Sequence, residues 1–395
     1  MLALAAGGGY VFSGGCDGEV IAWRRSDLGF AAVLHKGAPS GQSARALCVA
    51  AAHLFCGGES QELHCWSLAS LKPGPALPAL HTQAVTALAA VPRTPLAERR
   101  GERRGSPAAA SVGLFTASLD GAIRGWDLTA DPAQDLTDGV AGGGAAGGGL
   151  RGGEPVGPLL GHTGPVVCLA AAAEAAEDAS ALLGLLQPKG RRTFGRVLYS
   201  GGADKTVRVW DPMRRCQLRV LNQPAFTVGV SAVAPVPAGG TAAGGGVLSG
   251  SHDLRLWRGG ALLRALRMRQ HPGKIVSLAC ADGGTHCYSG CDGGAIRAFA
   301  LPALDAIGAM QAGGAVRALL LDGDVLFSGS ADGKLSAWAG FAAATAAAAA
   351  APAAYSRGAS SALPSRRPAT APAQGARLTD PDGRPVPPPG WRQGR

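Results

Sequence analysis

Two groups of histidine and cysteine residues in this sequence have side chains that could ligate a metal ion. They are His53, Cys56, His64 and Cys65 in the first group, and His286, Cys287 and Cys291 in the second. The nine cysteines include no C-x-x-C pair, the spacing typical of zinc sites, and they are scattered among predicted strands. Because cysteine is also a common small buried residue, we expect no metal site, no disulfide framework and no cofactor.

Motifs for nucleotide binding and nucleophilic catalysis match only weakly, within one stretch of the chain. Gly142, Gly144 and Gly147 fit the pattern G-x-G-x-x-G, but they lie in a Gly-rich stretch with no predicted strand before it and no helix after it. A phosphate cradle needs both elements. The patterns G-x-x-x-x-G-K-[ST] and G-x-S-x-G do not occur. We therefore expect a protein that is not an enzyme.

The chain is organised by a repeat. The stretch LYSGGADKTVRVWD at 198–211 reads as two strands joined by a tight turn, and similar stretches occupy 11–23, 54–66, 114–127, 247–257, 287–299 and 326–338. Six copies place Phe or Tyr eleven positions before the Trp or Phe that ends the copy. Successive ends are 39 to 47 residues apart, except for two longer intervals with visible insertions. A period near 40 predicts one small sheet per repeat.

Two dipeptides identify the family that the repeat resembles. Trp126-Asp127 and Trp210-Asp211 end two copies, and Gly161-His162 stands before the fourth. On these residues, the chain resembles the tryptophan-aspartate (WD) repeat β-propellers over nearly all of residues 1–340. The resemblance implies an all-β, seven-bladed propeller of four-stranded antiparallel blades, followed by a disordered Ala/Pro/Arg-rich tail at 341–395. One such sheet cannot bury both of its faces, whereas a closed ring of sheets can.

The resemblance also implies a hydrogen-bonded network of His, Ser, Asp and Trp inside a blade. The fourth copy carries the complete set, His162, Ser200, Asp204 and Trp210. Other copies carry the Asp and Trp positions only in part or with other partners: Asp17 and Trp23, Asp120 and Trp126, Asp332 and Trp338. A short carboxylate beside a tight turn can accept hydrogen bonds from the unpaired backbone N–H groups there. We expect these residues to hold blades together rather than to act in catalysis.

Closure of the ring is left open by the sequence. Met1 leads directly into LALAA, which reads as an innermost strand, so no upstream residue supplies a fourth strand for the last blade. Three alternatives remain: the Ala-rich stretch after Trp338 forms that strand, the ring is incompletely closed, or the natural chain begins earlier. The low strand propensity of Ala favours the last two.

Four insertions, near 91–109, 129–158, 173–195 and 235–246, interrupt the third to fifth blades. Because strands of a blade alternate in direction, all four should leave from the same face of the ring. We expect the Gly-rich run at 129–158 to be a linker and 173–186 to form a short helix. Basic residues of the first insertion would form a partner site for an acidic protein or RNA, unless the loops are merely tolerated expansions: Arg99, Arg100, Arg103 and Arg104.

The opposite face should carry a second candidate site around the mouth of the central channel. Its members stand just before the turn Asp of a copy or at the start of an innermost strand. They are Arg45, Leu119, His252, Lys274 and Arg317. A side chain of a bound peptide could enter there, although the same residues could simply form rim surface.

These observations favour a non-catalytic scaffold that mediates protein–protein interactions in a multiprotein complex. One alternative is an RNA-associated propeller that binds through its basic loops and tail. The net charge is +10, and the tail holds seven Arg against two Asp. Another alternative is the substrate-recognition subunit of a ubiquitin ligase, which the family marks with W-D-x-[RK]; after Trp210-Asp211 the basic residue, Arg214, comes one place late.

The N-terminal residues indicate where the protein acts. The stretch MLALAAGGGYVF lacks the basic start and long apolar run of a signal peptide, and apolar spans of membrane length are absent apart from Ala-rich low complexity. We expect a cytoplasmic or nuclear protein. Its partners should be proteins or peptides, with RNA as the alternative and no membrane or small-molecule substrate.

Overall fold

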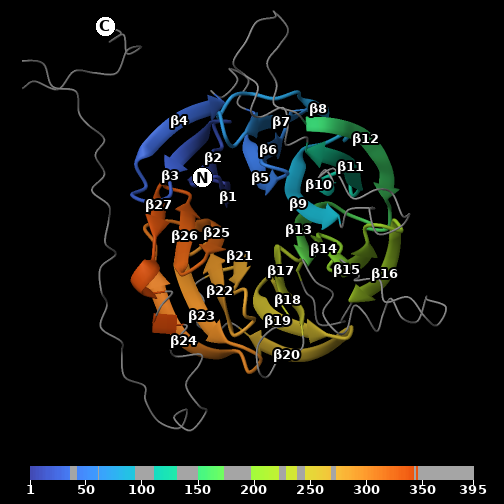
Figure 1. Cartoon of the computed structure of the whole chain (residues 1–395). Helices are drawn as coiled ribbons and strands as arrows, with labels where there is room; N and C mark the ends of the chain where they lie inside the picture. Colours follow the sequence, from blue (N-terminus) through green and yellow to red (C-terminus); the bar gives the residue numbers. More distant parts are fainter. Residues whose placement is uncertain are drawn as a thin grey trace, which may run out of the picture.

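The protein is a ring of seven antiparallel β-sheets around a central axis (Figure 1). This is a computed structural model, and it describes residues 1–35, 42–60, 62–93, 111–130, 150–172, 197–221, 228–237, 245–267, 273–341 and 344–345. Each sheet is formed by strands that follow one another in the chain, as the repeat predicts. The predicted seven-bladed β-propeller is confirmed. Within the described residues no helix reaches the length and apolar character that a membrane crossing requires.

Six of the sheets have four strands, numbered here as blades one to six in chain order, with the innermost strand first. Blades one to three contain β1 (Ala3–Gly7), β2 (Tyr10–Gly14), β3 (Val20–Arg24) and β4 (Phe30–His35); β5 (Ala44–Ala50), β6 (His53–Gly58), β7 (Glu62–Ser67) and β8 (Leu77–Pro78); and β9 (Val85–Arg93), β10 (Ser111–Ser118), β11 (Ile123–Ala130) and β12 (Leu150–Leu159). Blades four to six contain β13 (Val166–Ala172), β14 (Val197–Gly202), β15 (Val207–Asp211) and β16 (Cys216–Leu221); β17 (Ala232–Val236), β18 (Gly246–Gly250), β19 (Asp253–Arg258) and β20 (Ala261–Arg267); and β21 (Ile275–Cys280), β22 (His286–Cys291), β23 (Ala295–Ala300) and β24 (Asp305–Gln311).

The third strand of each blade packs against two neighbours because successive side chains of a strand point to opposite faces. In β15, Val207 and Val209 belong to a buried cluster shared with blade five, whereas Trp210 belongs to a cluster shared with blade three. Both valines and the indole are at most 3% exposed. Blades therefore stabilise one another chiefly by burying apolar side chains between sheets.

A glycine near the end of the second strand lets the next blade approach closely. In blade two, a Cβ added to Gly57 would lie 2.7 Å from Val85 Cγ1 on the innermost strand of blade three. The same short approach, 2.5 to 2.7 Å, occurs at three further interfaces: Gly201 against Val230, Gly250 against Ile275, and Gly290 against Val316. This contact explains why the repeat reads Ser-Gly or Gly-Gly before its turn.

One predicted linker contains a strand. The sequence assigns 129–158 to a Gly-rich connection, but β11 continues to Ala130 and β12 covers Leu150–Leu159, paired along β11. That prediction was wrong for these ends because an outer strand is held by backbone hydrogen bonds, which residues of low strand propensity can also form. The predicted helix at 173–186, most of the other insertions and the tail from 346 onward lie outside the described residues.

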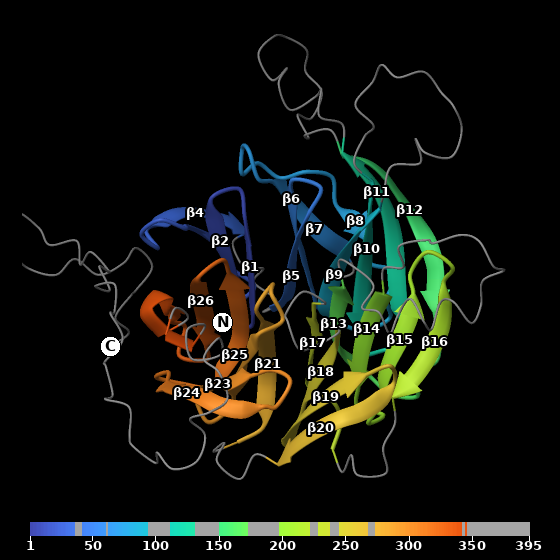
Figure 2. The ribbon, with the colours of Figure 1, turned by 60° about the horizontal axis from the view of Figure 1, so that its bottom comes forward.

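The seventh blade has three strands among the described residues: β25 (Val316–Asp322), β26 (Val325–Ser330) and β27 (Leu335–Ala337). After Trp338, residues 339–341 form a helical turn instead of a strand. The ring closes where β1 meets β25 and β26, with the Met1 amino group donating to Ser330 O at 3.1 Å. Figure 2 shows blades one and seven side by side at this junction.

Candidate functional site

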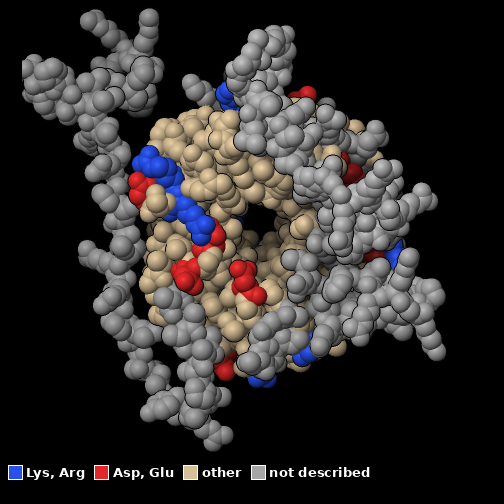
Figure 3. All heavy atoms as spheres, viewed as in Figure 1, with Lys and Arg blue, Asp and Glu red and all other residues tan. Residues whose placement is uncertain are grey.

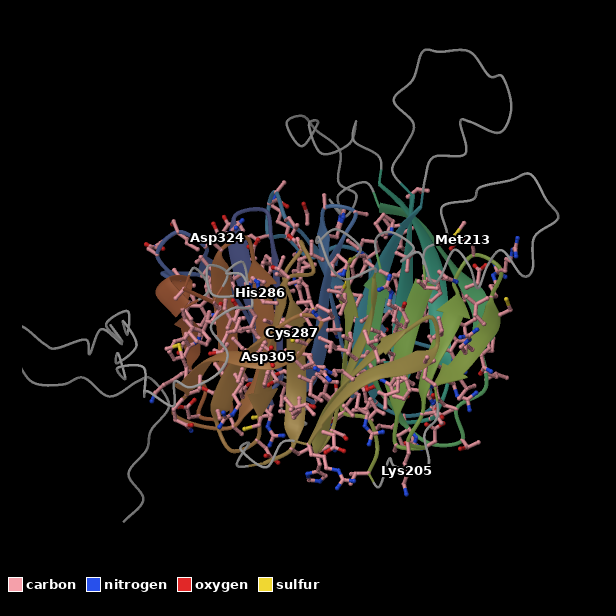
Figure 4. The ribbon with its side chains drawn as sticks, turned by 90° about the horizontal axis from the view of Figure 1, so that it is seen from below. Lys205, Met213, His286, Cys287, Asp305 and Asp324 are labelled. Carbon is pink, nitrogen blue, oxygen red and sulfur yellow. The ribbon has the colours of Figure 1, made fainter. Side chains whose placement is uncertain are left out.

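The two faces of the ring carry different connections. We call the face with the turns between second and third strands the turn face, and the opposite face the loop face. Figure 4 shows Lys205, in a second-to-third turn, on one side of the ring, and Asp324 and Met213, in first-to-second and third-to-fourth loops, on the other. The described strand ends that flank the four insertions lie on the loop face, because they join the same strand pairs.

Blade four contains a hydrogen-bonded chain of four side chains. Trp210 Nε1 donates to Ser200 Oγ at 2.8 Å, and Ser200 Oγ lies 2.7 Å from His162 Nε2. On the other side of the imidazole ring, His162 Nδ1 lies 2.8 Å from Asp204 Oδ2. Burial lowers the pKa of His162, so the neutral imidazole donates from Nδ1 to the carboxylate and accepts from the serine hydroxyl.

The same atoms have the order of a Ser-His-Asp catalytic triad, so their accessibility decides what they can do. Ser200 is fully buried, and its oxygen already accepts the Trp210 indole N–H. The side chains of His162 and Asp204 are 1% and 4% exposed. A nucleophile must reach its substrate. In this arrangement the serine is enclosed, and the network instead fixes the turn, because Asp204 also accepts from Thr163 N and Thr206 N.

Blade three repeats part of this network with a threonine in place of the serine. His81 Nε2 lies 2.7 Å from Thr116 Oγ1, and His81 Nδ1 lies 2.9 Å from Asp120 Oδ2. Trp126 does not join it: its indole nitrogen is buried and has no hydrogen-bond partner among the described residues. The extra methyl group of threonine restricts its rotamers, which fits a hydroxyl that serves one partner.

In blades one and seven the tryptophan and the aspartate bind separate partners. Trp23 donates to Ser13 at 2.9 Å and Trp338 donates to Ser328 at 2.8 Å. The carboxylates of their copies bind locally: Asp17 accepts from Glu19 N, and Asp332 accepts from Lys334 N. The structure therefore does not bring Asp17 to Trp23, or Asp332 to Trp338, through a histidine.

The histidine and cysteine groups do not converge on a common point. His53 Nδ1 lies 2.8 Å from Ala51 O, and Cys65 Sγ donates to Pro75 O at 3.1 Å. His286 and Cys287 lie on β22 within blade six (Figure 4). Burial raises the pKa of Cys56 to about 12, which disfavours the thiolate that a metal requires. The described residues contain no cluster of three or more His, Cys, Asp or Glu side chains arranged to hold a metal ion.

β-Bulges position two of the predicted channel-mouth residues. The pairing of β5 with β6 shifts between Ala44 and Ala46, and that of β25 with β26 shifts between Val316 and Ala318. Arg45 and Arg317 are the extra residues, and a bulge re-aims the side chain of such a residue away from the ladder. Both are exposed at the turn-face ends of innermost strands.

The other three predicted residues have less uniform surroundings. Lys274 comes directly before β21 and is half-buried, and its carbonyl accepts from Asp292 N at 3.0 Å. His252 is exposed in the turn between β18 and β19, whereas Leu119 is half-buried and its N–H donates to Ala84 O. All three nevertheless lie on the turn face, the same face as Arg45 and Arg317.

Only one of the three positive charges at the channel mouth is neutralised by a described carboxylate. Arg45 Nη2 lies 2.6 Å from Glu59 Oε1, a contact that lowers the pKa of Glu59. Arg317 and Lys274 form no ion pair with any described residue. We call Arg317 and Lys274 the mouth cations. They leave positive charge available to a ligand at this end of the channel.

Sequence reasoning missed a column of arginines. Four consecutive blades place Arg on the third strand, two positions before the aromatic residue that ends the repeat: Arg124, Arg208, Arg255 and Arg297. Arg208 lies opposite Ser200 on the neighbouring strand and 3.7 Å from Asp204. The recurring letters R-x-W or R-x-F carried this signal. Because the Arg208 side chain is only 12% exposed, we assign it to the blade network rather than to a binding surface.

The basic cluster predicted on the loop face is not among the described residues. Arg99, Arg100, Arg103 and Arg104 lie outside the described residues. Figure 3 shows the central opening on this face, with acidic and basic side chains gathered beside it over blades seven and one. There, Arg25 pairs with Asp322 at 2.9 Å and Arg24 pairs with Asp27 at 3.0 Å.

Comparison with known proteins agrees with this architecture. The family model "WD domain, G-beta repeat" matches residues 188–211. The crystal structure of the RRP9 WD40 repeats superposes with a TM-score of 0.59 at 17% identity, covering 83% of this chain and 86% of that one. The structure of U3-55K gives a TM-score of 0.58 at 18% identity, covering 83% and 88%. A comparison with curated protein sequences finds no match.

Proposed function

We propose that this seven-bladed β-propeller, which matches the WD-repeat family model at residues 188–211, is a non-catalytic scaffold that binds another protein at the channel mouth of the turn face. The observation that carries the proposal is the pair of mouth cations. A bulge sets Arg317 off the ladder between β25 and β26, and its side chain is exposed. Lys274 comes directly before β21, the innermost strand of the neighbouring blade six. Neither side chain forms an ion pair with a described carboxylate.

The chemistry of the mouth selects an acidic side chain of the partner. A carboxylate of the partner that binds Arg317 and Lys274 gains charge-assisted hydrogen bonds without breaking an existing ion pair. Arg45 contributes less, because binding there would compete with Glu59 at 2.6 Å. The enclosed Ser200 and His162 take no part in this binding and supply no catalysis.

Charge reversal tests this proposal. The full chain with both Arg317→Glu and Lys274→Glu is expressed in cells beside the wild type, and co-purified proteins are identified by mass spectrometry. We expect specific partners to be lost from the double variant. The matched control is Lys205→Glu, an exposed change on the same face in a turn of blade four, and it should retain them. Unchanged partners in the double variant would contradict the proposal.

Nuclease treatment separates this function from the RNA alternative. Partners held by the mouth cations should survive nuclease digestion, because the contact is between proteins. Partners that disappear on digestion, together with binding that weakens steeply with salt, would indicate an RNA-associated propeller instead.

A further inference from the structure

Six of the seven aromatic residues that end a repeat are covered by the outer strand of the preceding blade. Trp210 packs in one buried cluster with Leu159 of β12, and Trp257 packs with Leu221 of β16. Trp338 packs in the same way against Ile307 of β24. Five repeat tryptophans and Phe299 are at most 4% exposed as a result.

The interface between blades seven and one departs from this pattern. Trp23 faces blade seven, which has no fourth strand among the described residues, and Trp23 is only half-buried. Phe30 of β4 stands edge-on to it, with ring centroids 6.4 Å apart at 86°, and is 56% exposed. The aromatic residue that ends the repeat is buried at the other interfaces, but here it is only half-buried and Phe30 beside it is exposed.

The opposite wall of the same interface is also uncovered. Leu335 stands three positions before Trp338, and the residues at this position in the other six blades are fully buried: Val20, Leu63, Ile123, Val207, Leu254 and Ile296. Leu335 is only half-buried. Its side chain is apolar like theirs, so the sequence places a core residue where the described structure leaves a surface.

The backbone of β27 offers hydrogen bonds at this surface. Trp338 N donates inward to Leu326 O at 2.9 Å, and Leu335 to Ala337 pair with β26 alone. In an antiparallel ladder, alternate residues bond to opposite sides. The N–H and C=O groups of Leu335 and Ala337 therefore point outward, on the side that the fourth strand occupies in other blades (Figure 1).

We propose that this edge, which we call the seam edge and define by Leu335, Ala337, Trp23 and Phe30, binds an extended segment of a partner protein as the fourth strand of blade seven. The segment pairs antiparallel with β27 and carries apolar residues at alternating positions. One of these residues covers Trp23 and Leu335. Strand addition of this kind takes its affinity from main-chain hydrogen bonds and its specificity from alternate side chains.

The chain's own C-terminal residues are poor candidates for this strand. In blades one, four, five and six the third and fourth strands are joined by a short turn, but here residues 339–341 turn helical and lead toward blade six. Phe341 packs on Tyr288 at 5.9 Å between ring centroids, and the hydroxyl of Thr345 hydrogen-bonds that of Tyr288. Residues 346–395 contain nine Pro and only three β-branched residues, a composition that disfavours strands.

The seam edge is separate from the mouth cations, so this proposal goes beyond the proposed function and can fail independently of it. The mouth cations lie at the channel on the turn face. The seam edge lies at the outer rim between blades seven and one. Charge reversal at Arg317 and Lys274 should therefore leave strand addition unchanged.

A peptide with a known covering role provides the probe. The labelled peptide DAIGAMQ has the sequence of β24, the strand that covers Trp338, and its binding to the full chain is measured by fluorescence anisotropy. We expect saturable binding that is at least tenfold weaker for Leu335→Glu. The matched control, Leu263→Glu on the outer strand of blade five, is 50% exposed and should bind within twofold of the wild type. A scrambled peptide controls for non-specific binding.

A proline substitution tests the main-chain contact. Ala337→Pro removes one outward N–H and leaves the inward ladder to β26 intact, a change that edge strands tolerate. Melting curves should show that the fold is retained, and peptide binding should fall at least tenfold. Unchanged binding by Ala337→Pro, or no saturable binding to the wild type, would overturn the proposal.

Hydrogen exchange on the full chain distinguishes other occupants. The amides of Leu335 and Ala337 should exchange much faster than those of Val207 and Val209, and the peptide should protect them. Protection without the peptide means that the edge is already filled. If the protein then sediments as a monomer, its own tail is the occupant, and if it sediments as a dimer, a second copy is; either outcome overturns the proposal of a partner strand.

A photo-crosslinker at Phe30 tests the same claim in cells. Benzoylphenylalanine keeps the phenyl ring of Phe30 and adds a photoreactive benzoyl group, for which this 56% exposed position leaves room, and Leu263 receives it in a control. The crosslinked peptide is sequenced, and the experiment is repeated with Ala337→Pro. We expect a segment of another protein with alternating apolar residues, lost in the proline variant. Crosslinks confined to residues 346–395 of the chain would refute the proposal.

Discussion

The glycine at the end of the second strand should be indispensable where a neighbouring blade packs directly on it. Replacing Gly57 by Ala places the new Cβ 2.7 Å from Val85 Cγ1, 3.1 Å from Val85 Cβ and 3.2 Å from Leu63 Cδ2. Carbon atoms prefer separations of about 3.5 to 4.0 Å. Val85 and Leu63 are both fully buried, so neither can move into solvent to relieve the contact.

The expected cost is that of overpacking a well-filled interior, about 1 to 3 kcal/mol of the free energy of unfolding. The backbone of Gly57 does not have a positive φ, so this cost is steric rather than conformational. The matched control is Gly157→Ala, at an exposed position in β12 where an added Cβ meets no atom within 4 Å. That change should alter stability by less than about 0.5 kcal/mol.

Urea denaturation followed by tryptophan fluorescence measures both variants. Combining Gly57→Ala with Val85→Ala removes the atom that the new methyl meets. Val85→Ala alone should cost about 2 kcal/mol through the loss of buried methyl groups. The double variant should be more stable than the sum of the two losses by about 1 kcal/mol. Strict additivity in the double variant, or equal stability of Gly57→Ala and Gly157→Ala, would refute the close approach between blades.

Three further predictions concern buried polar groups and thiols. Ser200→Ala should lower the free energy of unfolding by about 1 kcal/mol more than Thr116→Val, because Ser200 has two buried hydrogen-bond partners and Thr116 has one from its histidine; equal urea midpoints would contradict this. Burial lowers the pKa of His162 in the folded protein. As the pH falls below about 6.5, this histidine is therefore protonated first in the unfolded chain, which stabilises the unfolded state. Between pH 7.5 and 5.5 the free energy of unfolding should fall by less in His162→Gln than in the wild type. At pH 8, a thiol reagent should label the exposed Cys16 at once and Cys56, whose pKa is raised to about 12, only after unfolding; rapid labelling of both would refute the burial.

The architecture could be predicted from the sequence because the signal is periodic. Phe or Tyr and Trp recur eleven positions apart with a tight turn between them, and seven such hairpins can bury their faces only against one another. The network of His162, Ser200, Asp204 and Trp210 followed from the same resemblance, and the structure places these side chains within hydrogen-bonding distance. Local patterns of this kind depend on residues within one repeat.

Other features depend on contacts between repeats. The Gly-rich stretch before Leu159 gave no sign of a strand, because β12 is held by backbone pairing to β11. The mouth cations are 43 residues apart in the sequence, and only closure of the ring places them at one channel. Trp23 looks like the other repeat tryptophans in sequence, yet it lies against the one described blade with three strands.

The sequence by itself determined the number of blades, the position of each turn and the residues available to pack between sheets. The tertiary structure alone decided which of those residues are covered. Burial of a blade face is a property of two neighbouring sheets, so a residue such as Leu335 can have the type of a core residue and still lie at a surface. The physical reason is that apolar side chains specify a need for a neighbour, whereas only the assembled ring shows whether a neighbour is present.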